Sequence, residues 1–180
     1  LDALTRQDYA GSRQIIVVDD GSTDGTETVA RCYAEVQYVR QTNRGPAAAR
    51  NRGIKASEGE IVAFIDDDCL APADWLSHLI EGYERYPIAA GVGGFVRAPA
   101  EVERRNVLAR FEWRVSLSYG VGETEMLGGF ECPAGGTSNM SYRREALREV
   151  GGFDESFPVA AGEDADLKWR ICQSGAQLLY

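Results

Sequence analysis

The sequence has 180 residues with 28 acidic and 19 basic side chains, and its formal net charge is −9 at pH 7. This charge argues against binding to nucleic acid or to an anionic membrane surface, because both need a basic face. The cysteines are widely spaced without a CxxC pair, which argues against a zinc site; they are Cys32, Cys69, Cys132 and Cys172. Reduced thiols are typical of a cytoplasmic protein, and the sequence contains neither a signal peptide nor an apolar stretch that could span a bilayer.

Strands alternate with helices along the first half of the sequence. The hydrophobic pattern predicts strands at 15–18, 36–40, 59–68 and 89–97, with helices at 26–35, 47–57 and 73–86 between them. This order predicts βαβ units and an α/β fold with a mixed, mostly parallel sheet flanked by helices. The β-branched run at 15–18 indicates a strand buried on both faces. Ligands of such sheets bind outside the carboxyl ends of the strands, where the acidic clusters fall.

The second half of the sequence is less regular. A helix is predicted over 100–120, with Leu108, Phe111 and Val115 on its inner side. The sequence begins at Leu1 inside a predicted helix and ends in "AQLLY", which is typical of the start of a strand. We therefore expect residues 1–180 to be a single domain that is truncated at both ends and belongs to a longer protein.

The segment "FIDDDCL" is the strongest chemical signal. In an extended strand Asp66 and Asp68 would share one side and Asp67 would lie on the other. Three ionised carboxylates this close raise one another's pKa unless a cation or a donor compensates them. A divalent ion such as Mg²⁺ or Mn²⁺ takes oxygen ligands and would complete its shell with substrate phosphate oxygens. The alternative is an exposed acidic turn before the helix that Pro72 opens.

The segment "VVDDGSTDGT" places Asp19 and Asp20 at the end of a strand. Its first positions are similar to those of a calcium-binding loop. The twelfth position is Arg31, however, where an EF-hand needs a bidentate glutamate. The sequence also lacks the GxxxxGK[ST] of a phosphate-binding loop. The acids could accept hydrogen bonds from a nucleobase or ribose, or Ser22 and Asp24 of this segment could cap the following helix.

The segment "GEDADLKWR" has three acids in the first turn of a predicted helix, where the helix dipole favours carboxylates. Asp166 and Arg170 are spaced as an i,i+4 ion pair. Taken alone, this segment is structural. Beside the other two clusters, a carboxylate here could act as a general base.

Five segments together resemble the family 2 glycosyltransferases with the GT-A fold: "VVDDGSTDGT", "NRGPAAARNRGI", "GEIVAFIDDDC", "GGTSNMSYRREALREVGGFDE" and "GEDADLKWR". The resemblance covers nearly the whole sequence. It implies a metal-dependent inverting enzyme that moves a sugar from a nucleoside-diphosphate sugar to an acceptor hydroxyl. The family's first strand would precede Leu1, so the sequence lacks part of the base-binding wall.

The resemblance also implies roles for individual residues. It assigns Asp20, with Asp19 beside it, to the nucleotide base. Asp66 and Asp67 are expected to contact the ribose or the sugar, and Arg50 and Asn51 to line the donor side of the site. It assigns the loop beneath the donor sugar and acceptor to Gly135, Gly136 and Thr137. Asp68 is similar to the last acid of the family's DxD, the ligand of Mn²⁺ or Mg²⁺. Asp164, of the pair with Glu163, is similar to the catalytic base.

The resemblance leaves the substrates open. The donor could be of the UDP, GDP or dTDP type, and the acceptor could be a saccharide or lipid-linked, in polysaccharide, glycolipid or glycoprotein synthesis. The full-length parent could work in the cytoplasm at the inner face of the membrane. Two alternatives stay open: a non-catalytic nucleotide-sugar-binding module or inactive fragment, and a haloacid-dehalogenase-type phosphatase with Asp66 as nucleophile. Against the phosphatase, Leu70 stands where a Thr or Val is expected.

Overall fold

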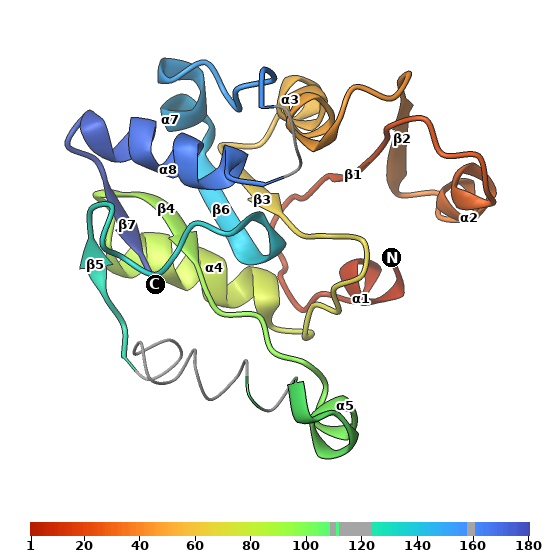
Figure 1. The fold of residues 1–180 in the computed structure, drawn as a ribbon, viewed down its shortest axis with the longest axis horizontal. Coiled ribbons are helices and arrows are strands. Elements are labelled where there is room, and N and C mark those ends of the chain that lie inside the picture. Colours follow the sequence, from red (N-terminus) through yellow and green to blue (C-terminus); the bar gives the residue numbers. More distant parts are fainter. Residues whose placement is uncertain (109–110, 112–123, 158–160) are drawn as a thin grey trace.

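The computed structural model describes residues 1–108, 111, 124–157 and 161–180 (Figure 1). The helices are α1 (Asp2–Thr5), α2 (Thr26–Arg31), α3 (Pro46–Ala56), α4 (Trp75–Arg85), α5 (Ala100–Arg105), α7 (Arg144–Glu149) and α8 (Glu163–Gln173), and a 3₁₀ helix, η1, spans Thr137–Asn139. The strands are β1 (Ile15–Asp19), β2 (Val36–Arg40), β3 (Ile61–Phe64), β4 (Ala89–Gly93), β5 (Leu127–Gly128), β6 (Met140–Arg143) and β7 (Gln177–Leu179). Within these ranges, no helix is both long and apolar enough to cross a bilayer.

The strands form a mixed arrangement, as the sequence predicts. β1 pairs in parallel with β2, and the other five strands form a sheet in the order β3-β6-β4-β7-β5. β3, β4 and β7 run in one direction, whereas β6 and β5 run antiparallel to their neighbours. The insertion of β6 between β3 and β4 brings the residues that precede β6 to the carboxyl end of β3.

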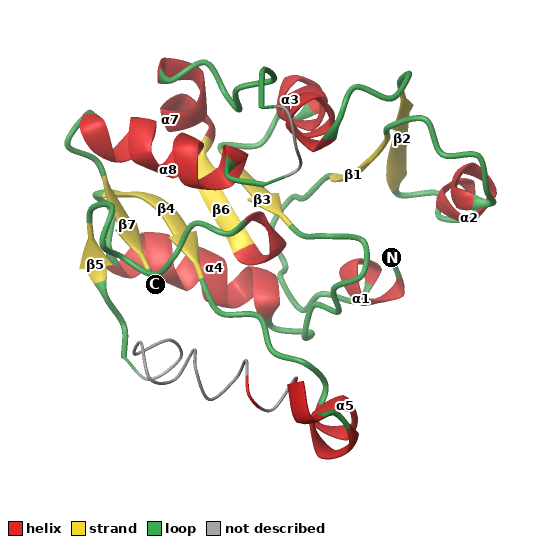
Figure 2. Ribbon diagram, viewed as in Figure 1, coloured by secondary structure: helices red, strands yellow, loops and turns green. Residues whose placement is uncertain are grey.

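Helices cover both faces of the five-stranded sheet (Figure 2). α7 and α8 pack on one face with Ala47 of α3 beside them, and α4 packs on the other. Adjacent residues of β7 point to opposite faces, so Leu178 joins the α8 side of the core and Leu179 the α4 side. On α4 the buried residues include Trp75 and Leu79, which lie on the helix face that the sequence predicts.

β1 is less buried than its sequence predicts. Its first four residues, at 15–18, are only partly buried, although their β-branched run indicates a strand covered on both faces. The reason is its place in the sheet: among the described residues β1 pairs with β2 alone, in a two-stranded ladder.

The predicted helix over 100–120 is interrupted in the structure at Asn106, and the described residues 107, 108 and 111 are helical again. α5 ends at Arg105 because Asn106 adopts an extended conformation, and its Oδ1 accepts the Leu108 N–H at 2.9 Å. Leu108 is 70% exposed and Phe111 is 62% exposed, so their predicted inward orientation is wrong. Val115 lies outside the described residues.

The contact between α4 and the sheet gives a stability prediction. A Cβ at Gly82 would lie 2.8 Å from Cγ1 of Val92 and 3.1 Å from Cδ2 of Leu179, and both residues are buried. We expect Gly82→Ala to lower the free energy of unfolding by about 1–3 kcal/mol, because overpacking outweighs the helix preference of alanine. The control is Gly53→Ala on α3, where a Cβ would lie 3.5 Å from Cγ2 of Val18, an ordinary contact.

The control should raise the free energy of unfolding by about 0.5–1 kcal/mol, since alanine is the better helix former. Urea unfolding of both variants measures the difference. A Gly82→Ala protein that is as stable as Gly53→Ala would contradict the packing described for α4.

Candidate active site

The first acid at the end of β1 is turned into the protein. Asp19 is 2% exposed; its Oδ1 accepts the Ser22 N–H at 2.6 Å, and its Oδ2 accepts the Tyr38 hydroxyl. The Arg40 guanidinium lies 3.4 Å from Oδ2. These donors, with the Tyr38 hydroxyl foremost, lower the pKa of Asp19 from 3.8 to about 2. Asp19 thus joins β1 to β2 and to the next turn, and the nucleotide contact predicted for it stays a prediction.

The second acid fixes the loop that leads into α3. Oδ1 of Asp20 accepts the Gln41 side-chain amide and the Arg44 N–H, both at 2.8 Å, and Oδ2 accepts the Gly45 N–H at 2.8 Å. Gly45 has a φ of 88°, a conformation that favours glycine. Protein donors therefore compensate both adjacent carboxylates, and Asp20 sets the start of α3 and with it the position of Arg50.

Arg50 on α3 joins two acidic motifs that lie far apart in the sequence. Its Nη1 donates to Oε1 of Glu163 at 2.6 Å across 113 residues, and its Nη2 lies 3.7 Å from Oδ1 of Asp66. The guanidinium also lies 5.5 Å from the centre of the Phe153 ring, within range of a cation–π interaction. The Glu163 side chain is 6% exposed, so the arginine compensates a buried charge. The "DDD" and "ED" segments thus meet at one place.

The glycine-rich loop before β6 reaches the same place. Oγ of Ser138 donates to Oδ2 of Asp66 at 2.6 Å. Ser138 lies in η1 next to the buried Thr137, and Gly135 and Gly136 come directly before this helix. Gly135 has a φ of 139°, which again favours glycine. The loop predicted to lie beneath the donor sugar and acceptor therefore adjoins the Asp66 carboxylate.

The other two acids of "DDD" face solvent. β3 ends at Phe64, so Asp67 and Asp68 lie in the turn after the strand, and the alternation predicted for an extended strand is wrong here. Both residues are exposed, and Oδ1 of Asp68 accepts the Cys69 thiol at 3.7 Å. No described arginine or lysine pairs with either carboxylate. These are the acids of the motif that are open to a ligand.

Asn51 is hydrogen-bonded to the segment that follows α7. Its Oδ1 accepts the Phe153 N–H and its Nδ2 donates to the Phe153 carbonyl, both at 2.8 Å. Nδ2 also lies 2.9 Å from Oε1 of Glu155, whose other oxygen pairs with Arg44 at 2.8 Å. Asn51 thus holds the segment after α7 against α3. Of the "ARN" segment, Arg50 is the residue that contacts the acids.

Asp164 and Glu163 begin α8 but differ in surroundings. Glu163 is held by Arg50, and its buried Oε2 has no hydrogen-bond partner among the described residues. Asp164 is half-buried, its Oδ1 accepts the N–H of the next residue at 2.8 Å, and no described cation pairs with it. The predicted pair of Asp166 and Arg170 is confirmed at 2.7 Å. A carboxylate without a cation partner at the start of a helix is a group that can act as a base, and Asp164 has this position.

The exposed acids suit a divalent ion that binds together with a ligand. In the part of the chain that the structure describes, no three His, Cys, Asp or Glu side chains gather into a metal site. Mg²⁺ commonly binds through one or two carboxylates plus substrate phosphates. The exposed Asp68 can supply one such carboxylate. The residues therefore fit a cation that binds with a nucleoside diphosphate.

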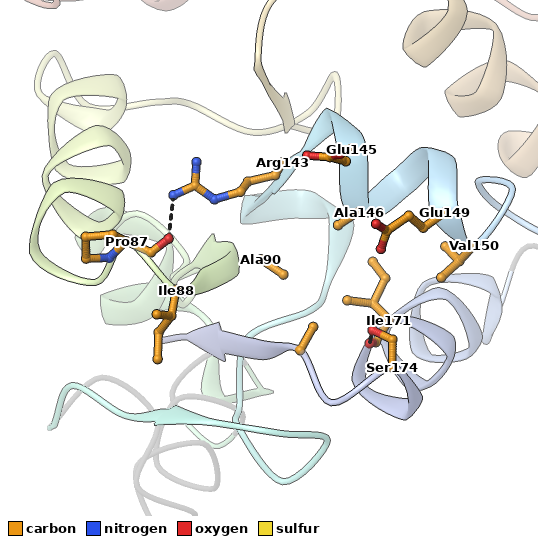
Figure 3. A pocket seen from close by; sticks show the side chains of 11 residues that line it. Pro87, Ile88, Ala90, Arg143, Glu145, Ala146, Glu149, Val150, Ile171 and Ser174 are labelled. Carbon is orange, nitrogen blue, oxygen red and sulfur yellow. Dashed lines mark hydrogen bonds between the residues drawn. The ribbon is translucent and has the colours of Figure 1, made fainter.

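A surface depression of about 210 Å³ has none of these acids in its lining (Figure 3). It is lined by residues such as Ala90, Ala146 and Ile171, and Ile171 belongs to the last turns of α8, whereas the acids are at its first turn. The Arg143 side chain at its edge donates to the backbone carbonyls of Pro87 at 3.0 Å and Ala89 at 2.9 Å. The guanidinium is thus occupied by backbone, and the depression is not part of the acidic site.

Sequence reasoning missed several polar partners of the acids, among them Tyr38, Arg40 and Ser138. Tyr38 and Arg40 bind Asp19 from β2, and Ser138 binds Asp66. The contact of Arg40 with Asp19 could be predicted only from the pairing of β1 with β2, because the parallel register places the two residues opposite each other. Tyr38 lies two residues before Arg40 on the same face of β2. Ser138 directly follows the "GGT" of a recognised motif, but its partner Asp66 is 72 residues away in the sequence.

The comparison with known families identifies the chain. The profile described as Glycosyl transferase family 2 matches residues 1–151. The chain therefore belongs to family 2 of the glycosyltransferases, as its motifs predict, and this membership excludes the phosphatase interpretation of Asp66.

Sequence relatives are longer than this chain. The pre-mycofactocin glycosyltransferase of Mycobacterium tuberculosis is 38% identical over 172 residues, which cover 93% of this chain and 35% of that protein. The glucosyl-dolichyl phosphate glucuronosyltransferase of Haloferax volcanii is 32% identical over 148 residues, which cover 78% and 46%. The chain thus spans between about a third and a half of the length of these relatives.

Solved structures share the fold. The mannosyltransferase PcManGT from Pyrobaculum calidifontis, in complex with GDP-Man and Mn²⁺, matches with a TM-score of 0.72 at 26% identity, over 98% of this chain and 48% of that one. S. aureus TarS 1–349 in complex with UDP-GlcNAc matches with a TM-score of 0.71 at 19% identity, over 98% and 50%. The second likeness supports the fold alone. The predicted GT-A α/β fold is confirmed.

The buried hydrogen bond to Asp19 gives a prediction about pH. The folded pKa of Asp19 is about 2, below its ordinary value of 3.8, so its stabilisation is fully present above pH 3.8 and is lost as the pH falls toward 2. Tyr38→Phe removes the foremost donor and raises the folded pKa. We therefore expect the difference in unfolding free energy between pH 5 and pH 2 to become smaller. Urea unfolding across this pH range measures it.

The control is Tyr33→Phe, because the Tyr33 hydroxyl donates to the exposed Asp2 at 3.0 Å. The control should keep the acid dependence of the wild type. The same acid dependence in the Tyr38→Phe protein would contradict the role given to this hydrogen bond.

Proposed function

We propose that the chain is the donor-binding and catalytic part of an inverting glycosyltransferase, which moves a sugar from a nucleoside-diphosphate sugar to an acceptor hydroxyl. The observation that carries this proposal is the contact of Arg50 with Asp66 and Glu163. This contact brings the acids that follow β3 next to the start of α8, where Asp164 stands. One site then contains acids that could bind the donor and an acid, Asp164, that could act as the general base.

Asp164 is the proposed general base. An acceptor hydroxyl gives its proton to the Asp164 carboxylate while its oxygen attacks the anomeric carbon of the donor sugar. The nucleoside diphosphate leaves from the opposite face, so the configuration at this carbon is inverted. This mechanism needs no covalent nucleophile, and a positioned base contributes about 10²–10⁴-fold to the rate.

The acids after β3 are the proposed donor site. Asp66, fixed by Arg50 and Ser138, and the exposed Asp67 would contact the ribose or the sugar. Asp68 would hold Mn²⁺ or Mg²⁺ with the diphosphate oxygens, and the cation would neutralise the charge that develops on the leaving group. Asp20 would help to bind the nucleotide base, and it fixes the loop ahead of α3.

The substrates are proposed as classes. One structural neighbour is in complex with GDP-Man, which supports a nucleoside-diphosphate sugar as the donor, and we propose a donor of the UDP, GDP or dTDP type. The name of the Haloferax relative includes a glucosyl-dolichyl phosphate. A saccharide or a lipid-linked saccharide is the acceptor that we propose.

Two variants of the full-length protein separate catalysis from donor binding. We expect Asp164→Asn to lower kcat about 10²–10⁴-fold and to leave donor binding unchanged, because it removes only the proton acceptor. We expect Asp68→Asn to abolish the Mn²⁺-dependent part of UDP or GDP binding. Calorimetry with and without Mn²⁺ and a nucleotide-release assay are the measurements.

Asp74→Asn is the control for the removal of an exposed charge at the start of α4, and it should behave as the wild type. Near-normal transfer by Asp164→Asn would show that the base is assigned wrongly. Metal-dependent nucleotide binding by a wild-type protein that neither transfers nor hydrolyses the donor would favour a non-catalytic binding module. No binding at all would contradict both functions.

A further inference from the structure

Lys168 of α8 contacts the segment 129–136 at three points. Its ammonium donates to the Cys132 carbonyl and lies 5.1 Å from the centre of the Phe130 ring. Its methylene chain lies against Gly135, where a Cβ would be 2.7 Å from Lys168 Cδ. The side chain is partly buried by these contacts. One lysine therefore holds the beginning, the middle and the end of this segment against the helix.

The same face of α8 carries the proposed base. Lys168 follows Asp164 by four residues, which is about one turn of the helix, so both side chains project on one side. The segment 129–136 consequently packs against the helix one turn below Asp164. Any shift of this segment changes its position relative to the Asp164 carboxylate.

The far end of the segment leads to the donor acids. Gly136 is followed by η1, where Ser138 donates to Asp66 at 2.6 Å. Lys168 therefore fixes residues 130–135 against α8, and Asp66 fixes Ser138 shortly after them. The conformation of this part of the chain couples the helix that carries the base to the acids that would hold the donor.

We propose that Lys168 is a positioning residue for sugar transfer. By holding the segment 129–136 on α8, it sets the distance between the acceptor oxygen at Asp164 and the donor sugar beside Asp66. Lys168 touches neither the reacting atoms nor the nucleotide in this scheme. The inference rests on the proposed function. The expected effect is on the rate, because a displacement of about 1 Å between reacting groups lowers the rate strongly.

The test replaces Lys168 by methionine in the full-length protein, which keeps the apolar chain and removes the ammonium. With GDP-mannose or UDP-N-acetylglucosamine as the donor, we expect kcat to fall about 10- to 100-fold and the donor KM to change less than about twofold. Amide hydrogen exchange should become faster within 129–136. Lys168→Arg keeps a cationic donor for the Cys132 carbonyl and should retain most of the activity.

Lys55→Met is the matched control, because Lys55 is the other lysine of the chain and is exposed on α3. It should leave both kcat and exchange as in the wild type. Unchanged kcat in Lys168→Met, or a loss of kcat with faster exchange spread over the whole protein, would overturn the proposal. A wild type that is inactive with every UDP, GDP and dTDP sugar would contradict the proposed function. In that case, unchanged exchange within 129–136 would also overturn the role of Lys168.

Discussion

The site depends on one buried electrostatic contact, the Arg50 guanidinium between Asp66 and Glu163. A carboxylate that is as buried as Glu163 is costly unless a cation compensates it, so Arg50 of α3 stabilises the position of α8. Arg50 in turn is placed by the loop that Asp20 fixes before α3. A chain of hydrogen bonds thus runs from the end of β1 to the first turn of α8. The acids of the site are held by charge as well as by packing.

Neighbouring acids in the motifs divide their roles in the same way. Glu163 is buried and paired, whereas Asp164 next to it is half-buried and has no described ion pair. Asp66 is held by protein donors, whereas the exposed Asp67 and Asp68 are open to a ligand. In these two motifs one acid is held by protein side chains, and an acid that follows it has no described cation partner. This arrangement accounts for adjacent carboxylates that would repel each other in an unstructured loop.

Much of this fold could be predicted because its information is local. The apolar run at 15–18 and the helical spacing of Trp75 and Leu79 gave the right elements, and the acids fell near strand ends. The partners of the acids could not be predicted, since the contact of Arg50 with Glu163 spans 113 residues. The antiparallel insertion of β6, which brings Ser138 to Asp66, depends on the packing of the whole sheet. The extended backbone at Asn106, which ends α5, was likewise hidden in a regular apolar pattern.

The central claim is that the acids after β3 and the start of α8 form one site for a nucleotide sugar. The most direct measurement is a crystal structure of the full-length protein with GDP or UDP and Mn²⁺, with the metal located by anomalous scattering. Our account expects the metal at the Asp68 carboxylate and the diphosphate, on the side of the site that Asp164 faces. Nucleotide and metal bound elsewhere, or Asp68 and Asp164 opening onto separate surfaces, would contradict it.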